Sequence, residues 1–505
     1  MKHSHWGISL FFFFTFAWTY GQQTDSLALK IKDNQDVIYQ FRKSLYDNPA
    51  AYLNYRQYNL TSFDLSKEVS KKSTTLAQEG KNVERLFFRA NAFNRLDEKS
   101  AVWGNASYNQ GKRQNIQWNE SADYELIFPY VVADSVGGDM KFENYEIQGG
   151  YVQQIGKYNI GVSGFYKAKL EYRNVDPRPK NLATQVGGSL GGSRNFDQNF
   201  SIGIQLEIEK YTQKHNMSFY SPTGFPVIYE MNGMGNFNNL LKGKRRQAFY
   251  DGWKYGTSFQ IYETQQNKWF LTGGIHVFNF EKLLPEFYDV QASKAKDILY
   301  KLTAGKWFEF NTTTVGVLFY GSKQTRKGTE NLFVNETTTN FIKIGQEERY
   351  RYEESQVQLS GVWKYQESRN EYSVWPFVGW TQQIERYAQP YSKTEVQSIN
   401  FGVHAQWLHT FRNGSLLTVE PSLQQKQVQN EKAILTYGVS NAINQMLLDN
   451  YEVQIADYWM GSYKIKYDFA LPGFVDAFVT GEYKYQHFDK LSKNSSILVS
   501  LGITF

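Results

Sequence analysis

The sequence predicts an all-β fold: a transmembrane antiparallel β-barrel of the outer-membrane type, with about 18 strands (16 is the other count it allows) and a short N-terminal helix. Three observations lead to this prediction. Apolar and polar residues alternate over segments of roughly ten to sixteen residues, which suit tilted membrane strands better than soluble ones. The connections alternate between short and long. Aromatic residues make up 17% of the chain, yet the mean hydropathy is only −0.56.

Residues 1–21 are predicted to be a secretory signal peptide. A weakly basic start is followed by an apolar core at 8–17 and by the small residues Thr19 and Gly21 before a cut at Gln22. The core is shorter than the ~18 apolar residues of a spanning helix. The chain has no cysteine, which excludes disulfides, thiolate chemistry and a lipid-anchored N-terminal Cys.

Residues 22–54 are predicted to form a periplasmic or plugging helical segment. Its apolar residues recur at helical steps of three, four and seven: Leu27, Ile31, Ile38, Phe41 and Leu45. The helix should end at Asn48-Pro49, because proline disfavours helix in the residue before it. An apolar stripe needs a partner, and the segment leads directly into the first strand. We therefore expect it to close the periplasmic end of the barrel and to bury that stripe.

Residues 55–505 are predicted to form the transmembrane barrel. The expected strands are 55–69, 84–96, 100–112, 141–155, 158–173, 184–196, 199–213, 248–263, 268–283, 297–309, 312–326, 353–367, 371–387, 395–412, 415–430, 455–470, 474–490 and 494–505. The count is even, so both termini fall on the periplasmic side. The span 214–247 is the least regular and leaves room for an extra outer hairpin.

Alternation within each strand assigns one face to lipid and the other to the lumen. Residues predicted to face lipid include Ile160, Val162, Ile202, Ile204, Val479 and Val499. Short turns such as Gly156-Lys157 and long loops such as 113–140, 214–247, 327–352 and 431–454 would lie at opposite ends. A soluble sandwich also alternates, but it has no reason to gather its short turns at one end.

The last strand ends on Phe505, with Ile503 two residues earlier. This ending resembles the terminal signal that the outer-membrane assembly machinery reads, so that machinery is an expected partner. Ser500 stands where the signal usually has glycine.

Several stretches resemble an uncharacterised outer-membrane β-barrel family of Bacteroidota, a domain of unknown function. The most specific stretch is 172–181, Tyr-Arg-Asn-Val-Asp-Pro-Arg-Pro-Lys-Asn. Others are Trp103-Gly104, Pro129-Tyr130, Asp134 with Gly137-Gly138, Gly149-Gly150-Tyr151, Lys210-Tyr211 with Gln213, and Gly233-Met234-Gly235. Asn48-Pro49-Ala50 also looks like the pre-barrel motif of transport, gliding and secretion barrels of that phylum. The resemblance implies the fold and an outer-membrane location, and it implies no activity or catalytic residue.

Two groups of polar residues are candidate functional sites. The polar lumen face carries Lys167, Lys169, Glu171, Glu207, Glu209, Lys464, Lys466, Asp468, Asp476, Glu482 and Lys484. Because both signs interleave, this face is either a ladder of salt bridges that stiffens the wall or a polar conduit for a solute. The second group is Arg173, Asp176 and Arg178. It lies in an outer loop that Pro177 and Pro179 stiffen, because the proline ring fixes the backbone angle φ. It is either a loop folded by an Arg–Asp pair or a contact for an anion or glycan.

Other chemistry is not expected. His404 and His409 are five apart, so on one strand they point to opposite faces and cannot share a metal. The run Gly187–Gly192 lies inside an alternating strand and lacks the Lys-Ser/Thr of a phosphate loop. The net charge of +6 is small for 505 residues, which argues against nucleic acid as a partner. We therefore expect no cofactor, no metal and no enzymatic activity.

The sequence leaves three functions open for a barrel in the cell outer membrane, surrounded by lipid. The first is a transport or channel-type barrel of unknown substrate, since a barrel of ~16–18 strands can enclose an aqueous channel. The second is a structural or accessory barrel that partners another envelope protein in a secretion or TonB-type uptake complex. An outer-membrane hydrolase is the least favoured.

Overall fold

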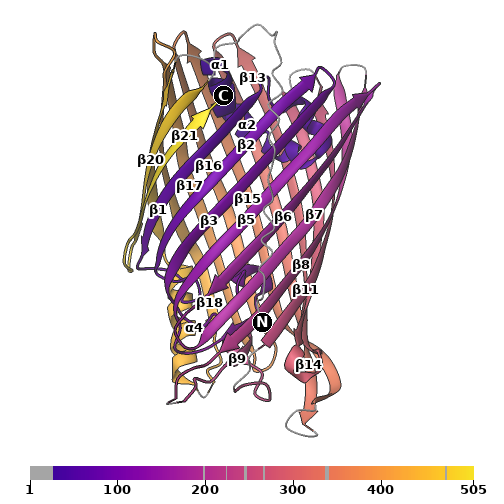
Figure 1. The fold of residues 1–505 in the computed structure, drawn as a ribbon, viewed down its shortest axis with the longest axis vertical. Coiled ribbons are helices and arrows are strands. Elements are labelled where there is room, and N and C mark those ends of the chain that lie inside the picture. The colour runs from indigo at the N-terminus through magenta and orange to yellow at the C-terminus, as the bar shows by residue number, and fades with distance from the viewer. Residues whose placement is uncertain are drawn as a thin grey trace, which may run out of the picture.

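The computed structural model describes residues 27–196, 199–222, 224–243, 247–264, 268–335, 341–438, 440–471 and 475–505. The signal peptide predicted at 1–21 lies outside these ranges. Within them, eighteen strands form one antiparallel sheet (Figure 1). Its first and last strands pair with each other, with Phe63 opposite Ile503 and Leu65 opposite Leu501. This pairing closes the sheet into a barrel and confirms the predicted fold.

The barrel strands follow the order of the chain around the wall. They are β1 (Leu60–Lys72), β2 (Asn82–Asp97), β3 (Ser100–Ile116), β5 (Gly138–Ile155), β6 (Tyr158–Tyr172), β7 (Arg178–Phe196), β8 (Phe200–Ser218), β11 (Gln247–Glu263), β12 (Trp269–Leu284), β13 (Val290–Phe310), β14 (Thr313–Asn335), β15 (Phe341–Glu367), β16 (Asn370–Tyr387), β17 (Ser392–Thr410), β18 (Leu416–Ile434), β19 (Tyr458–Phe469), β20 (Asp476–Phe488) and β21 (Asn494–Thr504). We call the end with the tight turns, such as Gly156-Lys157, the turn end, and the opposite end the loop end.

Some strand boundaries differ from the prediction. The strand expected from 353 begins at Phe341, and the one expected to end at 326 runs to Asn335. These two strands, β14 and β15, pair along this extra length and project beyond the rest of the barrel wall (Figure 1). Much of the loop expected at 327–352 is therefore strand. Phe333 and Phe341 pack there against Phe287, but the polar runs 327–331 and 346–349 interrupt the alternation, so no apolar period marks the extension.

The N-terminal helical segment consists of four short helices: α1 (Leu27–Gln35), α2 (Val37–Phe41), η1 (Lys43–Asp47) and η2 (Pro49–Asn54). The prediction of one continuous helix up to Asn48 is wrong. The break falls at Asp36, whose side chain accepts a hydrogen bond from the backbone N of Ile38 over 2.9 Å and so caps a new helix. The 3-10 turn of η2 also delays the first strand from residue 55 to Leu60.

Smaller elements lie at the loop end. They are α3 (Tyr124–Ile127), β4 (Val132–Ala133), β9 (Tyr229–Gly233), β10 (Asn236–Phe237), η3 (Pro285–Phe287) and α4 (Asn441–Ile455). The hairpin allowed for within 214–247 exists as β9 and β10, but it pairs with β4 in a separate three-stranded sheet and not with the wall. Among the described helices, none has the length and apolar character that crossing a membrane requires.

The two faces of the wall are as alternation predicts. Val162 and Ile204 are 52% and 58% exposed on the outer surface, and Ile160, Ile202 and Val499 are exposed beside them. Val479 is half-buried. Lumen-facing Gln205 and Thr480, which are adjacent in sequence to two of these residues, are buried.

This assignment predicts the effect of a charge on each face. Val162→Arg is expected to cost about 2–4 kcal/mol of barrel stability, because it places a cation in the hydrocarbon layer. Ser163→Arg is the matched control, since Ser163 borders a polar chamber of about 400 Å³ inside the lumen. Denaturant titration of the barrel folded into liposomes measures both. A larger loss for Ser163→Arg would reverse the assigned faces.

Candidate functional site: a lumen closed at both ends

The turn end is filled by residues 27–56, which we call the N-terminal plug. Its apolar side chains Ile31, Ile38, Phe41 and Leu45 are buried. The ring of Phe41 makes edge contacts with two wall residues, with centroids 5.9 Å from Phe270 and 5.6 Å from Trp307. Burying such side chains is the main free-energy gain of seating the plug.

Polar side chains fasten the same plug to the wall. Lys364 Nζ lies 2.7 Å from Asp36 Oδ2 and 3.2 Å from Glu371 Oε1. The amide of Gln260 donates to the carbonyl oxygen of Leu45 over 2.7 Å. The hydroxyl of Thr418 donates to Gln35 Oε1 over 2.5 Å. In each of these contacts the wall contributes a side chain, so the contacts lie outside the hydrogen-bond ladders of the barrel.

The motif Asn48-Pro49-Ala50 fits against a glycine-lined part of the wall. Asn48 accepts a hydrogen bond from the backbone N of Ala50 over 2.9 Å and donates to the carbonyl oxygen of Ile204 over 3.2 Å. A Cβ at Gly161 would overlap the backbone at Pro49, and one at Gly191 would overlap the Asn48 side chain. Part of the run Gly187–Gly192 is therefore glycine because the plug approaches the wall there.

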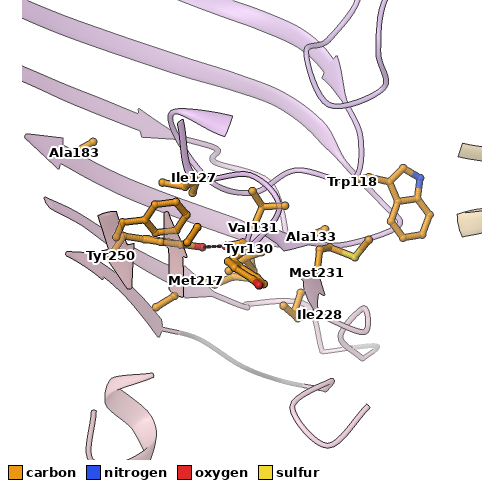
Figure 2. Packing of buried hydrophobic residues seen from close by; sticks show 14 of the residues in the cluster. Trp118, Ile127, Tyr130, Val131, Ala133, Ala183, Met217, Ile228, Met231 and Tyr250 are labelled. Carbon is orange, nitrogen blue, oxygen red and sulfur yellow. Dashed lines mark hydrogen bonds between the residues drawn. The ribbon is translucent and has the colours of Figure 1, made fainter. Parts of the chain in front are cut away.

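The loop end is filled by two long connections, 117–137 and 219–243, which we call the loop-end plug. Their apolar side chains form one cluster with the wall, which includes Ile127, Met231 and Tyr130. Figure 2 shows this cluster and the hydrogen bond in which the hydroxyl of Tyr250, on β11, donates to the carbonyl oxygen of Tyr130 over 2.8 Å. The long loops are thus folded inside the barrel mouth as a second core.

The loop-end plug also encloses charges. Arg173 Nη2 lies 2.7 Å from Glu120 Oε1 and 3.4 Å from Asp134 Oδ2, and all three side chains are almost fully buried. Burial, and then the neighbouring Asp134 carboxyl, raises the pKa of Glu120 well above its ordinary value. The charges of the two acids and the one arginine therefore balance best when Glu120 is protonated.

The predicted lumen residues near the loop end lie in ion pairs. Lys169 Nζ is 2.8 Å from Asp123 Oδ1 and 3.0 Å from Glu171 Oε1. Glu171 also contacts Arg113 Nη2 over 2.5 Å. Lys167 pairs with Glu146 on the neighbouring strand. A chamber of about 260 Å³ borders Lys167, Lys169 and Asp123.

The remaining members of the predicted lumen face also have partners. Glu207 Oε1 lies 3.0 Å from Lys254 Nζ and 2.7 Å from His276 Nδ1, and Glu209 lies 3.7 Å from the same lysine. The other pairs are Lys464 with Glu420, Lys466 with Asp468, and Lys484 with Glu482. Asp476 accepts a hydrogen bond from the backbone N of Leu471 at the turn end. The arrangement has the form of a salt-bridge ladder around a polar lumen.

The second predicted group is divided in the structure. Arg173 is turned inward to Glu120 and Asp134, and its Nε donates to the carbonyl oxygen of Pro177 over 2.8 Å. Arg178 remains 40% exposed, 2.8 Å from Asp176 Oδ1. Asp176 therefore pairs with Arg178, and only that arginine is accessible from outside.

A cavity of about 700 Å³, which was not predicted from the sequence, lies at the loop end. Its walls come from widely separated parts of the chain, among them lumen-facing Tyr352 and Glu385 on β15 and β16, Trp118 and Met231 in the loop-end plug, and Tyr451 on α4. Only tertiary folding brings these segments together, so no local motif marks the site.

Across the described ranges, no group of three His, Asp or Glu side chains converges as metal ligands would. Gly187–Gly191 has the Gly-x-Ser-x-Gly spacing of hydrolase nucleophiles. It nevertheless lies inside strand β7 and not on a strand-to-helix turn. The Oγ atoms of Ser189 and Ser163 share a hydrogen bond of 2.7 Å.

Comparison with solved structures finds outer-membrane barrels at low identity. The ferric yersiniabactin uptake receptor FyuA from Yersinia pestis is 8% identical, with a TM-score of 0.40, and the match covers 88% of this chain and 79% of that one. BauA, the ferric preacinetobactin receptor from Acinetobacter baumannii, is 8% identical, with a TM-score of 0.39 and coverage of 89% and 80%. The transporter YddB from Escherichia coli is 6% identical, with a TM-score of 0.39 and coverage of 88% and 81%.

A search of curated proteins found no match to the chain. The model of a family of unknown function, DUF6850, matches residues 49–505, from the Pro49 turn through the whole barrel to its last strand. The chain therefore belongs to the DUF6850 family.

Proposed function

We propose that the chain is a transport barrel of the cell outer membrane whose lumen is closed at rest and opens at the turn end when the N-terminal plug moves. The observation that carries this proposal is the way in which the plug is held. It contacts the wall through side chains such as Asp36 and Gln35, while every barrel strand keeps its own pairing. A plug that served only to stabilise the barrel would not need contacts that are independent of strand pairing.

The lumen behind the plug suits the passage of polar solutes. Charged side chains such as Glu207, Lys254 and Lys169 border chambers of about 400 and 260 Å³. A barrel of ~16–18 strands is wide enough for an aqueous channel once it is emptied. In this proposal lipid surrounds the exposed apolar belt, the turn end faces the periplasm, and another envelope protein moves the plug.

Deletion of residues 27–47 tests the proposal. A cysteine placed at Ser258, which borders the chamber of about 400 Å³ behind the plug, should be protected from a soluble maleimide in the full chain and labelled in the deletion, because the turn end is then unfilled while the strands still pair. Heat-modifiable migration on gels shows that each variant forms a barrel.

A matched pair supplies the control. The chain has no cysteine, so D36C with K364C can be joined by a short bismaleimide and compared with the same protein before cross-linking. The joined plug should stay closed under conditions that let the free plug open. A deletion that folds and stays closed contradicts the proposal. If that closed deletion also loses a copurifying envelope protein, the accessory-barrel function replaces it.

A further inference from the structure

The cavity at the loop end has an acidic lining. Three carboxylates border it, Glu125, Glu354 and Glu385, and Arg326 is the basic side chain among its described lining residues. The Nε and Nη2 atoms of Arg326 lie 2.9 and 2.6 Å from Asp297 Oδ2. Its Nη1 donates to the carbonyl oxygens of Glu125 and Phe128. All three nitrogens of this arginine therefore have partners, and the described lining residues include no other cation for an anionic ligand.

Two of the carboxylates are set in different ways. Glu354 Oε2 accepts hydrogen bonds from the hydroxyl of Tyr352 over 2.6 Å and from the amide of Gln383 over 2.7 Å, which fix its orientation. Glu385 stands on the neighbouring strand, and its Oε1 is buried without a hydrogen-bond partner. A buried acceptor of this kind is costly to leave unpaired. A donor supplied by a ligand would satisfy it.

The rest of the lining is aromatic and apolar. The rings of Trp118, Tyr124, Phe128 and Tyr352 and the side chain of Met446 border the same space. Aromatic rings attract cations through their faces and bury apolar groups well. A volume of about 700 Å³ is that of a site for a small organic molecule.

We propose that this cavity binds a small amphipathic cation: an organic amine with an aromatic or apolar group, whose ammonium lies between Glu354 and Glu385 and whose apolar part lies against the rings. Its role as a transported substrate rests on the proposed function. Binding itself does not, because the cavity lies at the end of the barrel opposite the N-terminal plug.

The test uses three ligands that share one ring system and differ in charge. They are tryptamine, neutral tryptophol and anionic indole-3-acetate, titrated calorimetrically into the purified full chain at pH 7.5. Tryptamine should bind about tenfold more tightly than tryptophol, because a charge-assisted hydrogen bond is lost with the amine. Indole-3-acetate should not bind. Equal binding of tryptamine and tryptophol, or no binding of tryptamine, overturns the proposal.

Variants locate the site. Glu354→Gln and Glu385→Gln should each weaken tryptamine about tenfold and leave tryptophol unchanged, since glutamine keeps the shape and removes the charge. Glu309 is a carboxylate at the turn end of the barrel. Glu309→Gln is therefore the matched control, and this variant should bind tryptamine as tightly as the unaltered chain does. Equal weakening in the control overturns the assignment to this cavity. A 27–47 deletion that stays closed but still binds tryptamine would refute the transport proposal and leave this one standing.

Discussion

Gly191→Val is expected to open the turn end of the barrel, whereas Gly192→Val, one residue further along the same strand, leaves it closed. A Cβ at Gly191 would overlap the side chain of Asn48, which lies in the turn between η1 and η2 of the N-terminal plug. A Cβ at Gly192 meets nothing within 4 Å, because this residue faces away from the lumen. The two substitutions add the same atoms to the same strand and differ only in the face that receives them.

Overpacking of a well-fitted contact costs about 1–3 kcal/mol. If this cost destabilises only the state in which the N-terminal plug is seated, the population of barrels with an unseated plug rises about 5–150-fold. Maleimide labelling of a cysteine placed at Ser258, which borders the chamber behind the plug, should therefore be faster for Gly191→Val, and Gly161→Val should act similarly because its Cβ would meet the backbone at Pro49. Equal labelling rates for Gly191→Val and Gly192→Val, with both barrels folded, would show that this contact does not hold the plug.

The barrel wall was predictable because membrane strands carry a local signal. In segment 158–172, alternation alone assigned Ile160 and Val162 to the outside, and both are exposed there. The signal stops where a polar run such as 346–349 interrupts the alternation. The start of β15 at Phe341 was missed for this reason, although pairing with β14 continues to that residue and Phe341 is buried.

The interior was much less predictable. Ile127, Tyr130 and Met231 have no shared period, and the last is about a hundred residues from the others in sequence, yet they form one core. Likewise, the sequence showed charges on the lumen face but not their partners. Lys169 pairs with Asp123 from the loop-end plug, and Glu171 with Arg113 on β3. The folded loop and the positions of the strands around the barrel decide these pairs, and neither is a local property.

Arg173 illustrates the same limit. The first acid after it in the same loop is Asp176, which suggested a local pair. The structure instead gives Asp176 to Arg178 and to the backbone N atoms of Tyr220 and Ser221. Arg173 enters the loop-end plug, where Glu120 and Asp134 are buried and need a cation.

Arg173→Met is accordingly expected to destabilise the loop-end plug by about 3–5 kcal/mol, because it leaves two adjacent buried acids without their cation. The matched control is Arg178→Met, which removes an exposed ion pair worth about 0–1 kcal/mol. Pulse proteolysis of the folded barrel, with cleavage mapped within 117–137, measures both. Similar protection in the two variants would mean that Arg173 does not hold this loop.

The defect should also depend on pH in a definite direction. Burial already holds the pKa of Glu120 above its ordinary value, and removing Arg173 takes away the neighbour that opposes this shift. A carboxyl with a raised folded pKa costs stability as pH rises from its unfolded pKa towards its folded one. The loop of Arg173→Met should therefore be cleaved faster at pH 8 than at pH 5. Glu120→Gln, which resembles the protonated acid, should remain close to the unaltered chain at both values; a loss as large as that of Arg173→Met would show that Glu120 is ionised beside Arg173.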